Sequence, residues 1–133
     1  MSEQVKPTLP KKKKAKRSVA VGHVHVLATF NNTIISVTDN KGKVLTQASA
    51  GGCGFRGSKK GTAYAAQVAA EKAINAAKQQ YNLAKADVFV KGVGLGRDAG
   101  VRALIGANVG VESITDTTTV PHGGCRPRKA RRL

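Results

Sequence analysis

The sequence predicts an α/β domain in which two helices cover a five-stranded mixed sheet, in the order βββαβαβ. Three observations support this class. Apolar and polar residues alternate with the period of a strand in the first third of the chain. A long alanine-rich segment in the middle repeats its apolar residues at three- and four-residue spacing, as a helix does. Two short apolar runs then flank a glycine-rich turn and a second helical segment.

The first three strands are predicted to form an antiparallel meander. From Val19 the alternation gives the first strand, and Asn31-Asn32 then indicates a tight turn, because Asn tolerates positive φ. The second strand covers 33–38 and the third 44–50, separated by a turn at 39–42. The first strand has Val24, Val26, Ala28 and Phe30 on its core face, and His23, His25 and Thr29 on the other.

A helix is predicted from Ala63 to Lys78. Its apolar stripe is thin, so the helix can lie close against a sheet. Thr62 is the predicted N-cap, because its hydroxyl can accept a backbone N–H of the first turn. The stripe consists of Ala66, Ala70, Ala73, Ile74 and Ala77.

The rest of the domain supplies a strand at 86–90, a glycine turn at 92–98, a helix at 99–106 and a last strand at 111–117. Crossovers between parallel strands are right-handed. If the sheet runs in the order 3-2-1-4-5, both helices cover one face and the other face stays open. That open face either docks on a large partner or stays exposed to solvent, as one face of an antiparallel sheet often does.

Charge is concentrated at the two ends of the chain. The 133 residues carry a formal charge of +16, with a pI near 10.5. Residues 1–18 hold seven basic residues and one acidic residue, and residues 121–133 hold five basic residues and no acid. We predict a disordered basic arm at 1–18, one α/β domain at 19–120 and an extended basic tail at 121–133. Such arms indicate a polyanionic partner. The alternative, a membrane surface, lacks an amphipathic basic helix with Trp or Phe.

The segment from Gly51 to Gly61 precedes the long helix and carries Arg56, Lys59 and Lys60 without any acid. A helix N-terminus is already partly positive, so each such cation costs roughly a few tenths of a kcal/mol. A bound anion would offset this cost, and glycines let a phosphate approach the backbone. We therefore predict a phosphate site here; the alternative is a solvated basic loop.

No metal, cofactor or membrane segment is predicted. Cys53 and Cys125 lack a metal-binding spacing, and His122 beside Cys125 is too little for zinc, which needs about four ligands. We expect two free thiols in a reducing compartment. No apolar run reaches the roughly 18 residues of a membrane span, and the N-terminus has no secretory h-region.

An enzymatic alternative depends on Gly94, Gly96 and Ala99, which match the G-x-G-x-x-A pattern of dinucleotide sites, with Glu112 near the position of a ribose-binding acid. The preceding strand is however the fourth of the domain, and no substrate domain follows. The segment 52–60 also lacks the Lys-Ser/Thr of a phosphate-binding Walker loop. The sequence contains no recognisable motif for a catalytic triad or a catalytic carboxylate pair, so we predict a protein that is not an enzyme.

Aromatic residues are few: three Phe, two Tyr and no Trp. Phe30 and Phe89 are expected in the core, which leaves only Phe55 in a basic loop. Modules that bind single-stranded bases use aromatic platforms. We therefore expect contacts mostly with phosphate and sugar of a folded nucleic acid.

Several stretches closely resemble the small ribosomal subunit protein eleven family in its bacterial form, over about residues 15–133. They are Phe30-Asn31-Asn32-Thr33-Ile34, Gly54-Phe55-Arg56-Gly57-Ser58-Lys59-Lys60, Tyr64-Ala65-Ala66-Gln67, Gly96-Arg97-Asp98 with Arg102-Ala103-Leu104, and Pro121-His122 with Gly124-Cys125-Arg126-Pro127.

The resemblance implies a ribonuclease-H-like topology and a structural, non-enzymatic role in translation. It implies a cytoplasmic place on the platform of the small (30S) subunit, bound to the central domain of 16S rRNA near the mRNA exit and the E site. The implied neighbours are small-subunit proteins six, seven, eighteen and twenty-one, with mRNA nearby. It implies no cofactor. A free nucleic-acid-binding regulator is the alternative function.

The predicted rRNA-binding residues combine the basic tails, the cationic loop and the family stretches. They are Lys11, Lys12, Lys13, Lys14, Lys16, Arg17, Asn31, Asn32, Phe55, Arg56, Gly57, Ser58, Lys59, Lys60, Arg97, Arg102, His122, Arg126, Arg128, Lys129, Arg131 and Arg132.

Overall fold

The computed structural model describes residues 18–132. Its elements follow the predicted order, with two short 3-10 turns, η1 and η2, added before the first α-helix. The predicted arm at 1–18 lies outside the described residues except for Ser18. The elements are β1 (Val21–Ala28), β2 (Thr33–Thr38), β3 (Val44–Ser49), η1 (Gly51–Cys53), η2 (Gly57–Gly61), α1 (Ala63–Tyr81), β4 (Lys85–Gly92), α2 (Ala99–Gly106) and β5 (Gly110–Asp116).

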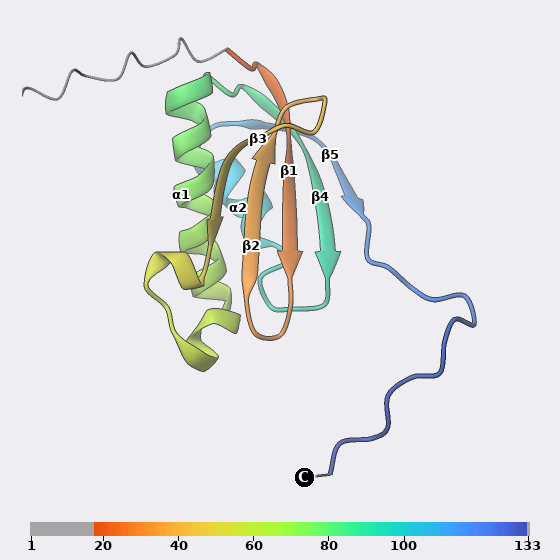
Figure 1. Cartoon of the computed structure of the whole chain (residues 1–133). Helices are drawn as coiled ribbons and strands as arrows, with labels where there is room; N and C mark the ends of the chain where they lie inside the picture. Colours follow the sequence, from red (N-terminus) through yellow and green to blue (C-terminus); the bar gives the residue numbers. More distant parts are fainter. Residues whose placement is uncertain (1–17, 133) are drawn as a thin grey trace, which may run out of the picture.

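The strands form one mixed sheet in the order β3-β2-β1-β4-β5, which confirms the predicted arrangement. β1 pairs antiparallel with β2, and β2 pairs antiparallel with β3, so the first half of the sheet is the predicted meander. β1 also pairs in parallel with β4, and β4 with β5. The carboxyl ends of β1, β4 and β5 therefore lie at one end of the sheet, the lower end in Figure 1.

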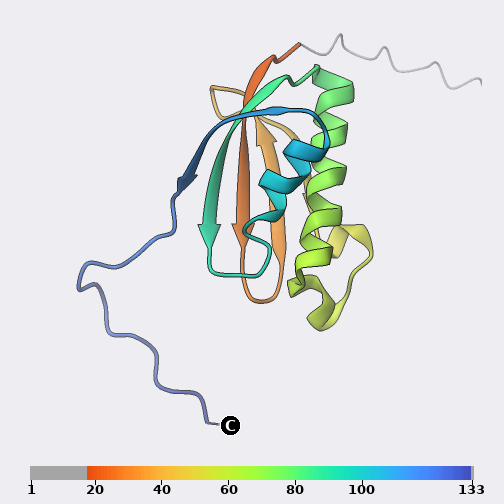
Figure 2. The same ribbon diagram turned by 180° about the vertical axis from the view of Figure 1, so that it is seen from behind.

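Both helices cover the same face of this sheet, as predicted. Figures 1 and 2 show α1 and α2 together on one side, with the opposite side uncovered. The alanine stripe explains how closely α1 packs, since Ala66, Ala70, Ala73 and Ala77 are all buried in the core. With such short side chains between the layers, Thr46 Oγ1 of β3 donates directly to the carbonyl of Ala73 at 3.0 Å.

The helix α1 extends past its predicted end at Lys78 and stops at Tyr81. Asn82 follows in the left-handed conformation (φ 54°), and its N–H donates to the Lys78 carbonyl at 3.1 Å. Asn suits this closing position because it tolerates left-handed backbone. Within residues 18–132, neither helix combines the length and apolar character needed to cross a bilayer.

The uncovered face of the sheet carries an aromatic cluster. His23 and His25 of β1 lie there, but the prediction that Phe89 is a core residue is wrong. β4 turns Val88 and Val90 inward, so the alternating Phe89 points to the open face, opposite His25. The Phe89 ring stacks on His25 with centroids 5.2 Å apart, and it meets His23 edge-on at 5.1 Å.

Polar groups surround this cluster. Asp87 Oδ2 lies 3.7 Å from His23 Nε2, and Ser113 Oγ donates to Asp87 Oδ1 at 2.8 Å. Burial lowers the pKa of His25 below its ordinary value, and the neighbouring His23 lowers it further. His25 therefore adds aromatic surface, and no positive charge, to the open face at neutral pH.

The turn between β1 and β2 also differs from its prediction. β1 ends at Ala28, so Phe30 lies in the turn and is 76% exposed, where the alternation had placed it in the core. Neither Asn of the turn has positive φ. The turn is closed by the Thr29 N–H donating to the Asn32 carbonyl at 2.9 Å, and Asn32 Oδ1 accepts from the Thr33 N–H at 2.9 Å.

Candidate nucleic-acid interface

Three loops meet at the end of the molecule where β1 and β4 finish. They are the β1–β2 turn at 29–32, the segment 51–62 before α1, and the β4–α2 loop at 93–98, and together we call them the loop end. A Cβ on Gly61 would lie 2.2 Å from the carbonyl oxygen of Phe30, so the start of α1 packs directly on the turn. A Cβ on Gly96 would lie 2.6 Å from the Cβ of Ala66, so the third loop packs on the same helix.

The cationic loop takes a defined shape within the loop end. Two 3-10 turns fold 51–61 back against the start of α1, and Arg56 Nη1 donates to the Gly51 carbonyl at 2.7 Å. Thr62 is the N-cap, as predicted: its Oγ1 accepts from the Ala65 N–H at 3.3 Å and donates to the Lys59 carbonyl at 2.8 Å.

The charge pattern at this helix start matches the prediction. Lys59 and Lys60 occupy the last turn of η2, directly before the cap of α1. The first turn of α1 contains no acid that could neutralise them. The side chain of Lys59 is exposed and that of Lys60 is half-buried. The partly positive helix end and these lysines together favour an anion such as phosphate.

Exposed apolar side chains accompany the cations. Phe30 and Leu95 of the loop end are 76% and 74% exposed, and Tyr64 in the adjoining first turn of α1 is 68% exposed. Phe55 meets Tyr64 edge-on, with ring centroids 5.8 Å apart. The sequence had indicated only Phe55 as an aromatic residue at the site. Tyr64 was missed because its place on the exposed side of α1 resembles an ordinary helix surface position.

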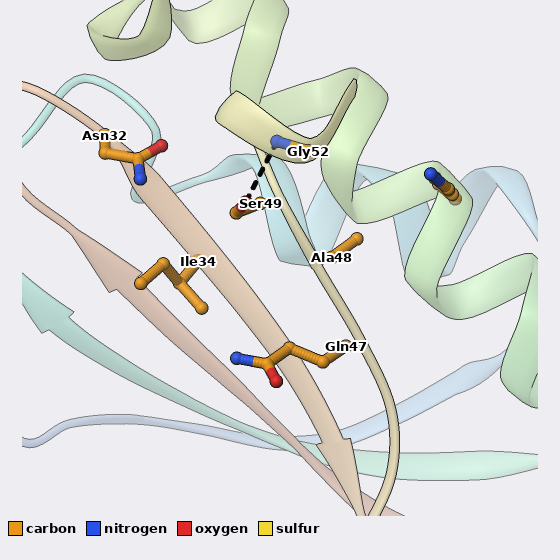
Figure 3. Close-up of a pocket in the computed structure, with 7 residues that line it drawn as sticks. Asn32, Ile34, Gln47, Ala48, Ser49 and Gly52 are labelled. Atoms are coloured by element: carbon orange, nitrogen blue, oxygen red, sulfur yellow. Dashed lines mark hydrogen bonds between the residues drawn. The ribbon is translucent and has the colours of Figure 1, made fainter. Parts of the chain in front are cut away.

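A shallow cavity of about 330 Å³ lies beside the β2–β3 pair and reaches the predicted residue Asn32. Figure 3 shows Asn32 and Gln47 near Ile34, with Ser49 Oγ accepting from the Gly52 N–H at 3.1 Å. Amide and hydroxyl groups of this kind suit the phosphate and sugar oxygens of RNA.

Arg97 has partners inside the protein. Its Nη2 donates to Asp116 Oδ2 at 2.8 Å, and its Nη1 donates to the Gly92 carbonyl and to Thr118 Oγ1. The hydrogen bond from Arg97 Nη1 to Thr118 Oγ1 is long, at 3.4 Å. Arg97 thus ties the β4–α2 loop to the end of β5, where the basic tail starts. RNA binding by Arg97 stays a prediction. An RNA phosphate bound there would share the guanidinium with Asp116, Gly92 and Thr118.

The Arg97–Asp116 tie gives a testable pH dependence. The hydroxyl and N–H of Thr118, and then Arg97, hold the pKa of Asp116 well below its usual range. A lowered folded-state pKa stabilises the fold above the unfolded value of about 3.9, and this contribution disappears as pH falls below that value. We expect the melting temperature of Asp116→Asn to fall less between pH 6 and pH 3 than that of the wild type. Equal losses in the two proteins would contradict the tie.

The basic tail starts near the loop end, because Asp116 at the end of β5 pairs with Val90, two residues before β4 ends. Its described residues contain no helix or strand and are exposed from Thr119 to Arg132. Figures 1 and 2 show it running away from the sheet. The predicted contacts that it presents to solvent are His122, Arg126, Arg128, Lys129, Arg131 and Arg132.

The predicted site residues thus fall into three groups. Asn31, Asn32 and residues 55–60 come together at the loop end. Arg102 joins them from α2, because it lines a small cavity together with Tyr64. The tail starts nearby but extends away, and the predicted lysines and Arg17 of the N-terminal arm lie outside the described residues. Within 18–132, Cys53 and Cys125 are free, and no group of three His, Cys, Asp or Glu side chains could hold a metal ion.

Comparison with known proteins gives a consistent result. The family model for ribosomal protein S11 matches residues 22–132. The small ribosomal subunit protein uS11 of Pseudoalteromonas atlantica is 54% identical over 127 residues, covering 96% of this chain and 97% of that protein. The uS11 proteins of Psychromonas ingrahamii and Pseudomonas fluorescens are each 52% identical, over 92% and 96% of this chain. The chain therefore belongs to the ribosomal protein S11 family.

Proposed function

We propose that this chain is a structural, non-enzymatic protein of the small ribosomal subunit that binds 16S rRNA through its loop end and basic tails. The observation that carries the proposal is the composition of the loop end. Lysines crowd the positive end of α1 without any acid in its first turn, and exposed Phe30 and Tyr64 lie beside them. Cations that can bind phosphate, next to rings that can stack on unpaired bases, suit an RNA interface.

The proposed organisation assigns a role to each part. Residues 19–120 form the RNA-binding domain, and 1–18 and 121–133 are arms that follow the phosphate backbone. The resemblance to the family implies a place on the platform of the 30S subunit, near the mRNA exit and the E site, with proteins six, seven, eighteen and twenty-one as neighbours, and this place is part of the proposal. The uncovered sheet face, with its stacked His25 and Phe89, is a surface on which such a neighbour or RNA can pack.

The test is the salt dependence of binding to a central-domain fragment of 16S rRNA. Proteins that make about 6–10 phosphate contacts lose roughly 10³–10⁵ in affinity between about 50 and 200 mM salt. We expect a slope of this steepness for the full chain. Deleting 121–133, which removes five basic residues, should flatten the slope of log affinity against log salt, because fewer counterions are released on binding.

The same deletion separates binding from folding. The described tail residues are exposed and lie beyond the last strand, so the melting temperature should change by no more than about 2 °C. A slope unchanged by removing both 1–18 and 121–133 would show that the tails do not bind RNA. A large fall in melting temperature would show that the tail packs on the domain. Failure of the full chain to bind any 16S rRNA fragment would refute the proposed function.

A further inference from the structure

A cavity of about 230 Å³ lies between the first turn of α1 and the start of α2, at the loop end. This volume is below the roughly 300–1,000 Å³ of pockets for drug-sized ligands, so the cavity suits a single flat ring system. Its walls combine an aromatic ring, small apolar groups, an amide, an acid and a guanidinium. The lining residues are Ala63, Tyr64, Gln67, Leu95, Asp98, Ala99 and Arg102.

Tyr64 is placed to stack on a ring that enters this cavity. Its side chain is 68% exposed, although it belongs to the first turn of α1 and has Phe55 packed edge-on against it. Leu95, which is also exposed, supplies an apolar side chain to the same cavity. An aromatic ring held by a second aromatic, beside an exposed leucine, is a platform for base stacking.

Asp98 is the unexpected group, because an acid opposes phosphate binding at an otherwise cationic end. It precedes α2 but makes no side-chain capping hydrogen bond. Among the described residues it also has no salt bridge, in contrast to Asp116, which Arg97 engages. Both carboxylate oxygens are therefore available to accept hydrogen bonds from a ligand in the cavity.

We propose that this cavity binds one extruded guanine base of an RNA, with Tyr64 stacking on the ring and Asp98 accepting from its Watson–Crick edge. The inference deepens the proposed function and rests on it. Guanine is the base that offers two adjacent donors, N1–H and the N2 amino group, which match the two oxygens of a carboxylate.

The surrounding charges decide between RNA and a protein ligand. An arginine side chain of a partner protein could also stack on Tyr64 and pair with Asp98. However, Arg102 lines the same cavity, and Lys59 and Lys60 directly precede the helix turn that forms its wall. These cations repel a guanidinium and attract the phosphates on either side of an extruded nucleotide.

The probes are four fluorescent RNA hexamers of uridine that carry G, A, C or U at the third position. Their affinity for the full chain is measured by anisotropy at one fixed salt concentration. A good bidentate pair discriminates bases by about 1–3 kcal/mol, which corresponds to about 5-fold to 150-fold in affinity. We expect the G hexamer to bind at least about fivefold more tightly than the other three.

Variants assign this preference to the cavity. Asp98→Asn keeps the shape of the side chain but offers only one acceptor atom, so the preference for G should fall below about twofold while the all-uridine hexamer binds as well as before or better. Tyr64→Ala should weaken the G hexamer about tenfold, and Tyr64→Phe should keep its binding. The matched control, Glu112→Gln, removes an exposed acid at the start of β5, near Lys85 and away from the loop end, and should leave the preference unchanged.

The outcomes distinguish failure of the guanine site from failure of the proposed rRNA-binding function. A chain that binds the 16S rRNA fragment but shows no preference for G, or keeps its preference in Asp98→Asn, overturns the guanine site and leaves the proposed function standing. A chain that binds neither the fragment nor any hexamer overturns both. If an arginine-containing hexapeptide competes with the G hexamer in the wild type but not in Asp98→Asn, the cavity takes a guanidinium and the proposal is wrong.

Discussion

Replacing Lys59 and Lys60 together by Glu is expected to lower the affinity for 16S rRNA by about 10²-fold at 0.1 M salt, without destabilising the free protein. Each phosphate contact contributes a slope of about −0.7 (single strands) to −0.9 (duplex DNA) in log affinity against log salt. Relative to 1 M salt, two lost contacts therefore cost on the order of 10²-fold at 0.1 M. Repulsion between the new carboxylates and phosphate adds to this loss.

The free protein should respond in the opposite direction. Lys59 and Lys60 lie in the last turn of η2, which ends at Gly61 just before the N-cap of α1, and the first turn of α1 has no acid. Acids suit this helix end, so the variant should gain up to about 1 kcal/mol in free energy of unfolding. Binding and thermal melting measured on the same preparation test both signs together.

A matched variant controls for net charge. Lys41 and Lys43 are exposed in the β2–β3 turn, at the end of the sheet opposite the loop end. Reversing both to Glu makes the same change in charge, and we expect a much smaller loss of affinity than at Lys59 and Lys60. If the loop variant keeps its affinity within about twofold, under half a kcal/mol, the loop is not a phosphate site.

Gly92→Ala should destabilise the fold by about 3 kcal/mol or more, and lower the melting temperature by about 10 °C or more. Gly92 has φ 108°, a conformation that only glycine adopts without strain, and a Cβ there would lie 2.0 Å from the carbonyl oxygen of Ala28. Backbone strain costs about 1–3 kcal/mol, and overpacking costs about 1–3 kcal/mol more. The clash lies in the central β1–β4 pair, where Ala28 is the partner of Gly92.

Gly106→Ala is the control for this substitution. Gly106 ends α2 without positive φ, and a Cβ there would meet no atom within 4 Å. The change should leave the free energy of unfolding unaltered or raise it by up to about 1 kcal/mol, because Ala loses less backbone entropy on folding. Thermal melting of the two variants provides the comparison, and a Gly92→Ala protein that melts within a few degrees of the wild type would contradict the geometry.

The sequence was sufficient for the parts of the fold that depend on periodicity and on local chemistry. Alternation and short apolar runs located the five strands, and β2 has the predicted bounds. The alanine stripe and Thr62 gave α1 and its start, because a cap involves only neighbouring residues. Given the strand order 3-2-1-4-5, the handedness of crossovers predicted that both helices cover one face.

The errors arose where tertiary contacts override a pattern. Phe30 continues the apolar alternation of β1, yet the chain has already turned. Phe89 lies in an apolar run that resembles a fully buried strand, but only one face of β4 is covered by helices. Arg97 resembles any basic loop residue until β5 brings Asp116 beside it.

The cavity at the loop end could not be predicted for a similar reason. Tyr64 and Asp98 are far apart in sequence, and their meeting depends on how Gly96 lets the β4–α2 loop approach α1. No local pattern encodes that approach. The cations of the same surface, together with Asn31, Asn32 and Phe55, were predicted in advance, because their residue types and motifs are evident in the sequence.

The parallel pairing of β1 with β4 also bears on how the chain reaches its native state. Val24 pairs with Val37 through a short hairpin, but its second neighbour, Val88, comes from much later in the chain. Contacts between distant segments require closure of a long loop before they stabilise anything, which slows folding. During synthesis, which starts at the N-terminus, the β1–β2–β3 meander can therefore form before β4 is made, and β1 is then an unprotected edge strand. The central strand of the finished sheet is thus the edge strand that is most open to wrong pairing during synthesis.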